Sequence, residues 1–220
     1  MRFMELLKSP KMLPEGPLLE LPLVAILRGI SPDRVLDVGL VLYDTGVRII
    51  EVPLNSPAPF DSIARLAKRL GECCVCGAGT VLAAEDVDRV RDVGGKLIVS
   101  PNTNSAVIAR ACRYGMVSMP GFATATEAFA AIAAGATHLK LFPAASYGPG
   151  HLKALKAVLP ESIPVLAVGG IGADQIAPWL SAGASGFGFG SELYKPAYTL
   201  DEIAERARRL VDAVRRVAQK

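Results

Sequence analysis

The chain has 220 residues, of which 51% are hydrophobic and 20% are charged, enough apolar sequence for one large α/β domain or two small ones. Its net charge of +3 is mild, and no basic stripe carries interleaved aromatic residues, so nucleic-acid binding is not indicated. The longest uncharged run, residues 175–191, is rich in glycine and contains Pro178, which argues against a membrane span.

The N-terminal segment, residues 1–21, has the pattern of a short helix followed by a linker that contains Pro10, Pro14 and Pro17. Glu5 interrupts the apolar core that a signal peptide would need. We expect this segment to be peripheral and to precede a single domain over residues 22–220.

From residue 22 onward the chain repeats one unit, made of an apolar strand, a loop, a helix and a glycine. The first helix is predicted to begin with Ser31 as its cap and to stop at Gly46. Two later helices open with capping boxes, at residues 124–127 and 199–202. The eight predicted strands cover residues 23–28, 47–52, 73–78, 97–100, 117–119, 138–142, 164–168 and 186–189.

Eight alternating strands and helices imply parallel pairing with right-handed crossovers. The strands are continuous apolar runs, as expected when both faces of the sheet are covered. The predicted fold class is therefore α/β, a (β/α)8 TIM barrel with an extra N-terminal helix. A doubly wound open sheet is the alternative, but the Gly-x-Gly-x-x-Gly motif that such sheets often carry is absent.

The four cysteines are Cys73, Cys74, Cys76 and Cys112. Cys73 and Cys76 have Cys-x-x-Cys spacing, but no second Cys or His pair follows at the distance typical of zinc sites. Because Cys-Cys-Val-Cys lies in a predicted strand, buried free thiols are the favoured interpretation. Free thiols suit a reducing compartment, so a cytoplasmic protein is expected.

Lys140 lies inside the apolar strand 138–142, which Pro143 ends. Burial disfavours an ammonium ion and lowers the pKa of a lysine, and a neutral amine attacks a carbonyl to form a Schiff base. The alternative is a lysine that extends from the strand end into water.

Glu51 lies in the apolar strand 47–52, where burial should raise its pKa toward that of a proton shuttle near neutral pH. The second and sixth strands are opposite each other in an eight-stranded barrel, so Glu51 and Lys140 are predicted to face one cavity from opposite walls. The alternative is a structural Glu–Lys ion pair.

Gly169 and Gly170 follow the seventh strand, and Gly190 and Ser191 follow the eighth. Barrels commonly bind phosphate at these two strand ends through backbone N–H groups, which glycine lets an anion approach. The alternative is that the glycines serve turns that need a positive φ.

Arg28 and Thr80 follow the first and third strands. The planar fork of Arg28 suits a carboxylate or a phosphate, and Thr80 adds a hydroxyl. The alternative partner of Arg28 is a surface acid. The only histidines, His138 and His151, are predicted near the start of a strand and in a helix, so neither a metal site nor a cofactor is expected.

Four segments together closely resemble the 2-keto-3-deoxy-6-phosphogluconate and 6-phosphogalactonate aldolase family: Glu51-Val-Pro-Leu-Asn-Ser-Pro57, Gly77-Ala-Gly-Thr-Val81, Leu139-Lys-Leu-Phe-Pro143 and Val168-Gly-Gly170. The likeness covers about residues 22–195. It implies a small (β/α)8 barrel, typically a homotrimer, that cleaves a phosphorylated keto-sugar acid without a metal. By this resemblance Lys140 is the Schiff-base lysine and Glu51 the general acid/base.

The gluconate branch of that family usually has Arg where this chain has Asn55, and Thr where it has Val168. The chain instead resembles the galactonate branch, which implies cleavage of 2-dehydro-3-deoxy-6-phosphogalactonate to pyruvate and glyceraldehyde 3-phosphate. The resemblance leaves Arg28 and Thr80 as candidates for the substrate carboxylate, although Arg28 is also a candidate for the phosphate.

Four residues are expected to line the substrate pocket: Asn55, Pro101, Phe142 and Val168. Cleavage of the gluconate epimer and a non-catalytic phosphosugar-binding barrel are the alternative functions. A phosphosugar epimerase or a thiamine-phosphate synthase would depend on metal ligands or pyrophosphate contacts, and no such cluster of acids and histidines is evident.

Overall fold

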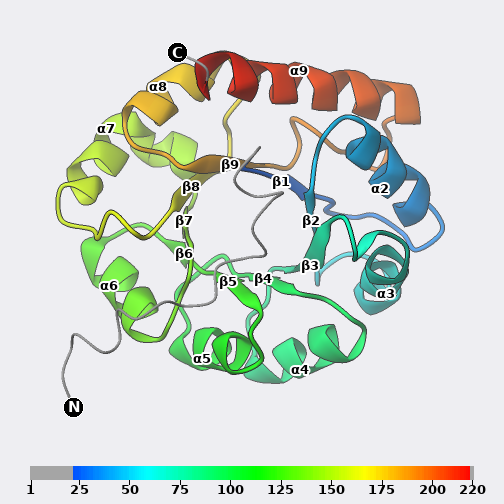
Figure 1. Cartoon of the computed structure of the whole chain (residues 1–220), viewed down its shortest axis with the longest axis horizontal. Coiled ribbons are helices and arrows are strands. Elements are labelled where there is room, and N and C mark those ends of the chain that lie inside the picture. The colour runs from blue at the N-terminus through cyan, green and yellow to red at the C-terminus, as the bar shows by residue number, and fades with distance from the viewer. Residues whose placement is uncertain (1–21, 219–220) are drawn as a thin grey trace.

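The computed structural model describes residues 22–218 and forms one ring of parallel strands inside a ring of helices (Figure 1). The predicted N-terminal helix and linker, residues 1–21, lie outside the described residues. The strands are β1 (Leu23–Ile26), β2 (Ile49–Pro53), β3 (Val75–Gly79), β4 (Leu97–Val99), β5 (Val117–Met119), β6 (Gly121–Phe122), β7 (Leu139–Leu141), β8 (Val165–Val168) and β9 (Gly186–Phe189).

The ring closes through the segment that contains Pro120. The strand order is β5-β4-β3-β2-β1-β9-β8-β7-β6, and only Pro120 separates β5 from β6. Proline has no N–H to donate, so it interrupts the ladder between β5, which matches the predicted strand 117–119, and β6, which was not predicted. Because β5 pairs with β4 and β6 pairs with β7, this segment joins the two ends of the sheet. The predicted eight-unit barrel is thereby confirmed.

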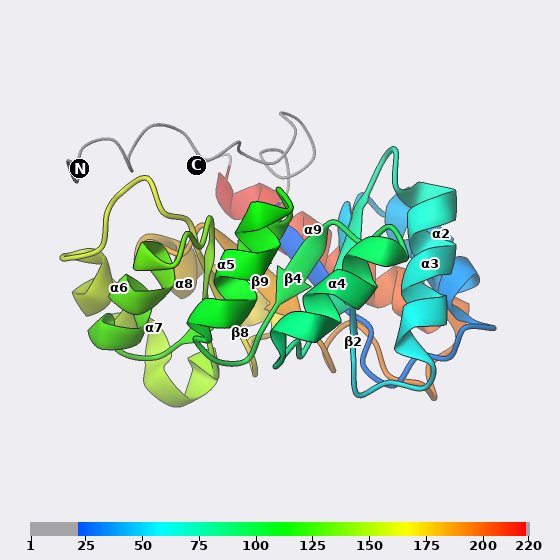
Figure 2. The same ribbon diagram turned by 90° about the horizontal axis from the view of Figure 1, so that it is seen from below.

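The helices cover the outer face of the barrel, as the side view also shows (Figure 2). They are α2 (Val35–Asp44), α3 (Pro59–Leu70), α4 (Ala84–Asp92), α5 (Ser105–Arg113), α6 (Ala125–Ala133), α7 (Ala144–Lys156), α8 (Ile176–Ser181) and α9 (Leu200–Ala218). Gly148, with φ of 78°, puts a kink near the start of α7. Among the residues that the structure describes, no helix is both long and apolar enough to cross a membrane.

Two apolar clusters hold the barrel together, as alternation along each strand requires. The larger cluster fills the space between strands and helices and includes Leu23, Ile50 and Phe187. The smaller one fills the barrel interior and consists of Val24, Ile26, Ile49, Val75, Leu97, Val99, Val117, Met119, Leu166 and Val168, with Phe142 packed against it. The interior is therefore a packed core below the site and not an open channel.

The start of α2 was predicted wrongly. The helix begins at Val35, with Arg34 as its N-cap residue, and the Ser31 side chain makes no capping bond. The Arg34 N–H donates to the Ser31 carbonyl at 3.2 Å, so Ser31 begins a turn instead of a helix. The Arg34 guanidinium donates to the Pro196 and Tyr198 carbonyls, which anchors this turn to the loop before α9.

The cysteines are all free thiols. Cys74 and Cys76 are buried, as predicted, and burial raises the pKa of each to about 12. Cys73 and Cys112 are only half-buried. Cys73 differs from the prediction because β3 begins at Val75, which leaves Cys73 in the preceding turn.

The capping box of α6 gives a direct test of helix stability. The Thr124 hydroxyl accepts from the Glu127 N–H at 3.3 Å, and the Glu127 carboxylate accepts from the Thr124 N–H at 2.9 Å. Thr124→Ala is expected to lower the free energy of unfolding by about 1 kcal/mol, measured by urea denaturation. The control Thr126→Ala, an exposed position inside the same helix, should lose none; equal losses would contradict the capping role.

Candidate active site

The candidate site lies at the carboxyl ends of the strands, where barrel folds carry their chemistry. Glu51 is on β2 and Lys140 is on β7. These strands are four positions apart in either direction around the ring when β5 and β6, which only Pro120 separates, are counted as one (Figure 1). The two side chains thus come from opposite walls, as the sequence predicts.

Glu51 is a buried acid with no hydrogen-bond partner for one of its oxygens. Its side chain is 2% exposed, and Oε2 is unpaired among the residues that the structure describes. Burial raises the pKa of Glu51 to about 7, although the positive charges of Lys140 and Arg28 act in the opposite direction. An acid with this pKa both takes and returns protons at neutral pH.

Lys140 is only 6% exposed, which does not fit an amine that extends into water. Burial lowers the pKa of Lys140. The negative charge of Glu51 acts to raise this pKa, and the positive charge of Arg28 acts to lower it further. The Nζ atom lies 4.6 Å from the centre of the Phe142 ring. Glu51 and Lys140, both of which the structure describes, are not joined by an ion pair within 4.0 Å.

Arg28 is exposed at the rim and is held by two uncharged side chains. Its Nη1 donates to Asn55 Oδ1 at 2.7 Å, and its Nη2 donates to Thr80 Oγ1 at the longer distance of 3.4 Å. No acidic side chain in residues 22–216 lies within 4.0 Å of the guanidinium. The alternative of a surface acid as its partner is therefore not supported.

The glycines after β8 and β9 are not all explained by turns. Gly169 and Gly170 have φ of 101° and 73°, a conformation that favours glycine. Gly190 has no such φ and has open space where a Cβ would lie. The N–H groups of Gly170, Gly190 and Ser191 make no hydrogen bond within the described part of the chain. Since β8 pairs with β9, these groups lie at neighbouring strand ends.

The four predicted pocket residues all lie at the carboxyl ends of strands: Asn55 after β2, Pro101 after β4, Phe142 after β7 and Val168 at the end of β8. Val168 belongs to the interior cluster, and Phe142 packs against that cluster. Gly188 leaves room there, because a Cβ on it would lie 2.8 Å from a Val168 methyl. Pro101, at the end of β4, brings its carbonyl against β6, where a Cβ on Gly121 would lie 2.2 Å from its oxygen.

Gly79 has a role in the site that the sequence alone did not predict. A Cβ on this residue would lie 1.9 Å from Glu51 Oε2, so the absence of a side chain makes room for the buried carboxylate. Its place at the end of a strand was visible in the sequence, but its neighbour was not. The neighbour of Gly79 is determined by the strand register, in which Gly79 pairs with Pro53 of β2, the strand that carries Glu51.

Gly79→Ala is expected to destabilise the fold by about 1–3 kcal/mol and to reduce activity, because the added methyl displaces the Glu51 carboxylate. Thermal unfolding and the rate of substrate cleavage, measured well below the midpoint, would test both effects. The control is Gly150→Ala, where a Cβ meets no atom within 4 Å. A fully active Gly79→Ala variant would show that the carboxylate does not need this space.

Neither histidine lies in the site. His138 precedes β7, and burial lowers its pKa to about 4, whereas His151 lies in α7 and contacts the Ala123 carbonyl at 2.6 Å through Nε2. Within residues 22–218 no group of three or more His, Cys, Asp or Glu is placed to hold a metal.

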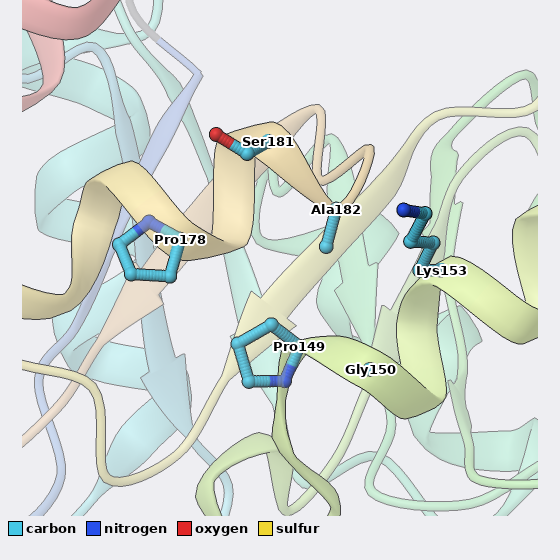
Figure 3. A pocket seen from close by; sticks show the side chains of 6 residues that line it. All are labelled: Pro149, Gly150, Lys153, Pro178, Ser181 and Ala182. Carbon is cyan, nitrogen blue, oxygen red and sulfur yellow. The ribbon is translucent and has the colours of Figure 1, made fainter.

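A separate hollow of about 210 Å³ lies outside the barrel, between α7 and α8 (Figure 3). It is lined by Pro149, Gly150, Lys153, Pro178, Ser181 and Ala182. None of the candidate residues lines it, so it is not part of the site.

Comparison with known proteins gives the family. The model of the KDPG and KHG aldolase family matches residues 15–207. A 2-dehydro-3-deoxy-6-phosphogalactonate aldolase of Escherichia coli (strain K12) is 49% identical over 91% of this chain and 98% of its own length. A 2-dehydro-3-deoxy-phosphogluconate aldolase of Pseudoalteromonas atlantica is 30% identical over 73% of this chain and 74% of its own.

A solved structure described as native KDPGal superposes with a TM-score of 0.90 at 47% identity, over 91% of this chain and 98% of that one. The family model, which matches residues 15–207, extends over every strand of the barrel described above. The chain belongs to the KDPG and KHG aldolase family.

Proposed function

We propose that this chain is a Schiff-base aldolase that cleaves 2-dehydro-3-deoxy-6-phosphogalactonate to pyruvate and glyceraldehyde 3-phosphate. The observation that carries the proposal is a buried lysine across the barrel from a buried, unpaired glutamate. The 49% identity to an aldolase named for this substrate supports the choice of sugar acid.

In the proposed mechanism, neutral Lys140 attacks the C2 carbonyl and forms a carbinolamine. Glu51 shuttles protons while this intermediate loses water to give a protonated imine. Glu51, directly or through a water, then takes the proton of the C4 hydroxyl. The C3–C4 bond breaks, its electrons pass to the imine nitrogen, and glyceraldehyde 3-phosphate leaves. Protonation of the enamine at C3 and hydrolysis of the imine release pyruvate and restore Lys140.

The remaining candidate residues are proposed to bind the carboxylate, the pyruvyl part and the phosphate of the substrate. Arg28, with Thr80, is proposed to hold the substrate carboxylate, since the guanidinium has no acidic partner within the described part of the chain. Phe142 is proposed to pack against the pyruvyl part. The N–H groups at Gly169, Gly170, Gly190 and Ser191 are proposed to bind the phosphate.

The choice of C4 epimer rests on Asn55 and Val168 and on the higher identity to the galactonate relative than to the gluconate one. We expect kcat/KM to be higher for the galactonate epimer when both are compared in a coupled assay of pyruvate release. A higher value for the gluconate epimer would reverse the assignment without affecting the imine chemistry.

Borohydride reduction in the presence of pyruvate tests the mechanism directly. Mass spectrometry should find a reduced pyruvate adduct on Lys140, and none on Lys153, an exposed lysine of α7 that serves as the control. If pyruvate binds but no adduct forms, the aldolase mechanism fails and a non-catalytic phosphosugar-binding barrel becomes the better hypothesis.

A homotrimer in the cytoplasm completes the proposal. The trimer rests on the family resemblance, and the reducing compartment is supported by the four free thiols. Light scattering coupled to size-exclusion chromatography should give three times the chain mass of 23.1 kDa.

A further inference from the structure

We propose that Asn55 and Thr80 are positioning residues that hold the Arg28 guanidinium toward the substrate carboxylate, a role that Thr80 has in addition to the contact with the carboxylate proposed above. This inference rests on the proposed function and adds to it the means by which an exposed arginine is kept in place. The juxtaposition that carries it is one arginine, from the β1–α2 loop, bonded to side chains of the two following loops.

The backbone on both sides of Arg28 is fixed first. The Leu27 N–H donates to the Glu51 carbonyl at 3.0 Å, and the Gly29 N–H donates to the buried Ser56 hydroxyl at 2.9 Å. The segment that carries the proposed acid/base therefore also anchors the loop that carries the arginine. These two bonds restrain the backbone on both sides of Arg28, so its long side chain is the part that still has to be held in place.

Asn55 restricts that side chain without cancelling its charge. Its amide oxygen accepts from Nη1 at 2.7 Å, a short hydrogen bond to a charged donor. A guanidinium has five N–H donors, so this bond and the contact with Thr80 leave several free for an anion. An aspartate at this place would form an ion pair and compete with the substrate.

Thr80 contributes through a strained backbone. Its φ of 56° lies in the left-handed region, which is unusual for a β-branched residue. Its hydroxyl contacts Arg28 Nη2 at 3.4 Å, the one side-chain hydrogen bond that this hydroxyl makes within residues 22–218. Strain of this kind persists where the rest of the structure imposes it, often at functional sites. A glycine would relieve the strain but would remove the hydroxyl.

The placement of Arg28 also matters for the reacting groups. Its positive charge acts to lower the pKa of Lys140 and of Glu51, so both groups lie within its electrostatic reach. An arginine free to swing into solvent would lose part of this influence as well as its hold on the carboxylate.

The test is a double-mutant cycle on pyruvate affinity, read from the concentration dependence of borohydride trapping on Lys140. Asn55→Ala is expected to raise the half-saturating pyruvate concentration about tenfold in the wild-type background and less than about twofold in an Arg28→Ala background. Equal effects in both backgrounds would overturn the proposal, because Asn55 would then act on the substrate directly. Asn55→Asp should weaken pyruvate at least as much as Asn55→Ala.

Thr80 gives a second readout that a merely structural role would not reproduce. Thr80→Gly should raise the melting temperature and weaken pyruvate, whereas Thr80→Ser should keep nearly the wild-type affinity. An unchanged pyruvate affinity in Thr80→Gly would refute its part in positioning Arg28. The control Asn104→Ala removes the N-cap of α5 and should lower the melting temperature without changing the affinity.

The failure of this inference is distinguishable from the failure of the proposed function. If wild-type protein forms no adduct on Lys140, the aldolase mechanism is wrong. If wild-type protein forms the adduct but the cycle shows additive effects, only the positioning of Arg28 by Asn55 is wrong, and the part of Thr80 is decided by the Thr80→Gly variant.

Discussion

Lys140→Met is expected to abolish cleavage, with a loss of at least about 10⁴-fold in kcat, because removal of a nucleophile leaves no covalent route. The methionine side chain is about as long as that of lysine and is apolar, which suits a buried site, so the fold should persist. The assay is pyruvate release from the phosphogalactonate substrate, together with borohydride trapping, in which the variant should show no adduct.

The same substitution is expected to make the protein more stable at neutral pH. The folded pKa of Lys140 is lowered by burial, so the unfolded chain binds the proton more tightly than the folded one. Burial of the charged Lys140 therefore destabilises the folded protein in full at low pH. This destabilisation disappears as the pH rises toward the ordinary lysine pKa of 10.5. The difference in the free energy of unfolding between Lys140→Met and wild type should therefore become smaller as the pH rises.

Lys153→Met, an exposed substitution on α7, is the matched control and should change neither activity nor the pH dependence of stability. Normal turnover by Lys140→Met would rule out the imine mechanism. Loss of turnover together with loss of the folded state would leave the pH series of unfolding, measured on wild type, as the deciding experiment on the buried amine.

The fold followed from the sequence because its local and global signals agree. Each strand is an apolar run, each helix has an apolar face, and the capping boxes at Thr124 and Thr199 were identified correctly. The boundary at Ser31 was wrong because a tertiary contact, from Arg34 to the loop before α9, decides where α2 starts. The closure at Pro120 was not predicted either, since pairing on both sides of one proline depends on the complete ring.

The sequence predicted which residues lie at the strand ends, but not which side chains meet there. A charged residue at the end of an apolar strand is visible in a sequence, which is how Glu51 and Lys140 were selected. The room that Gly79 provides and the bond between Arg28 and Asn55 depend on register and side-chain direction across strands. Such contacts join residues that are 27 or more positions apart, and no local pattern encodes them.

Glu51→Gln is expected to reduce kcat by roughly 10²–10⁴-fold while leaving the barrel intact, because the amide keeps the shape of the acid but cannot exchange protons.

The same variant should remove a pH dependence of stability. The folded pKa of Glu51 is about 7 against an ordinary 4.5, so the folded state binds the proton more tightly. Wild-type stability should therefore fall by up to about 3 kcal/mol between pH 4.5 and 7 relative to the variant, and level off above pH 7.

The measurement is urea unfolding of both proteins at several pH values from 4.5 to 8, with Glu161→Gln, an exposed substitution, as the control. Lys140 lowers the pKa of Glu51, so in a Lys140→Met background the fall should extend to higher pH. A stability difference that does not change with pH would mean that Glu51 titrates as an ordinary surface acid. Buried as it is, with an unpaired oxygen, Glu51 would then need a compensating partner, and the general acid/base would have to be sought elsewhere in the site.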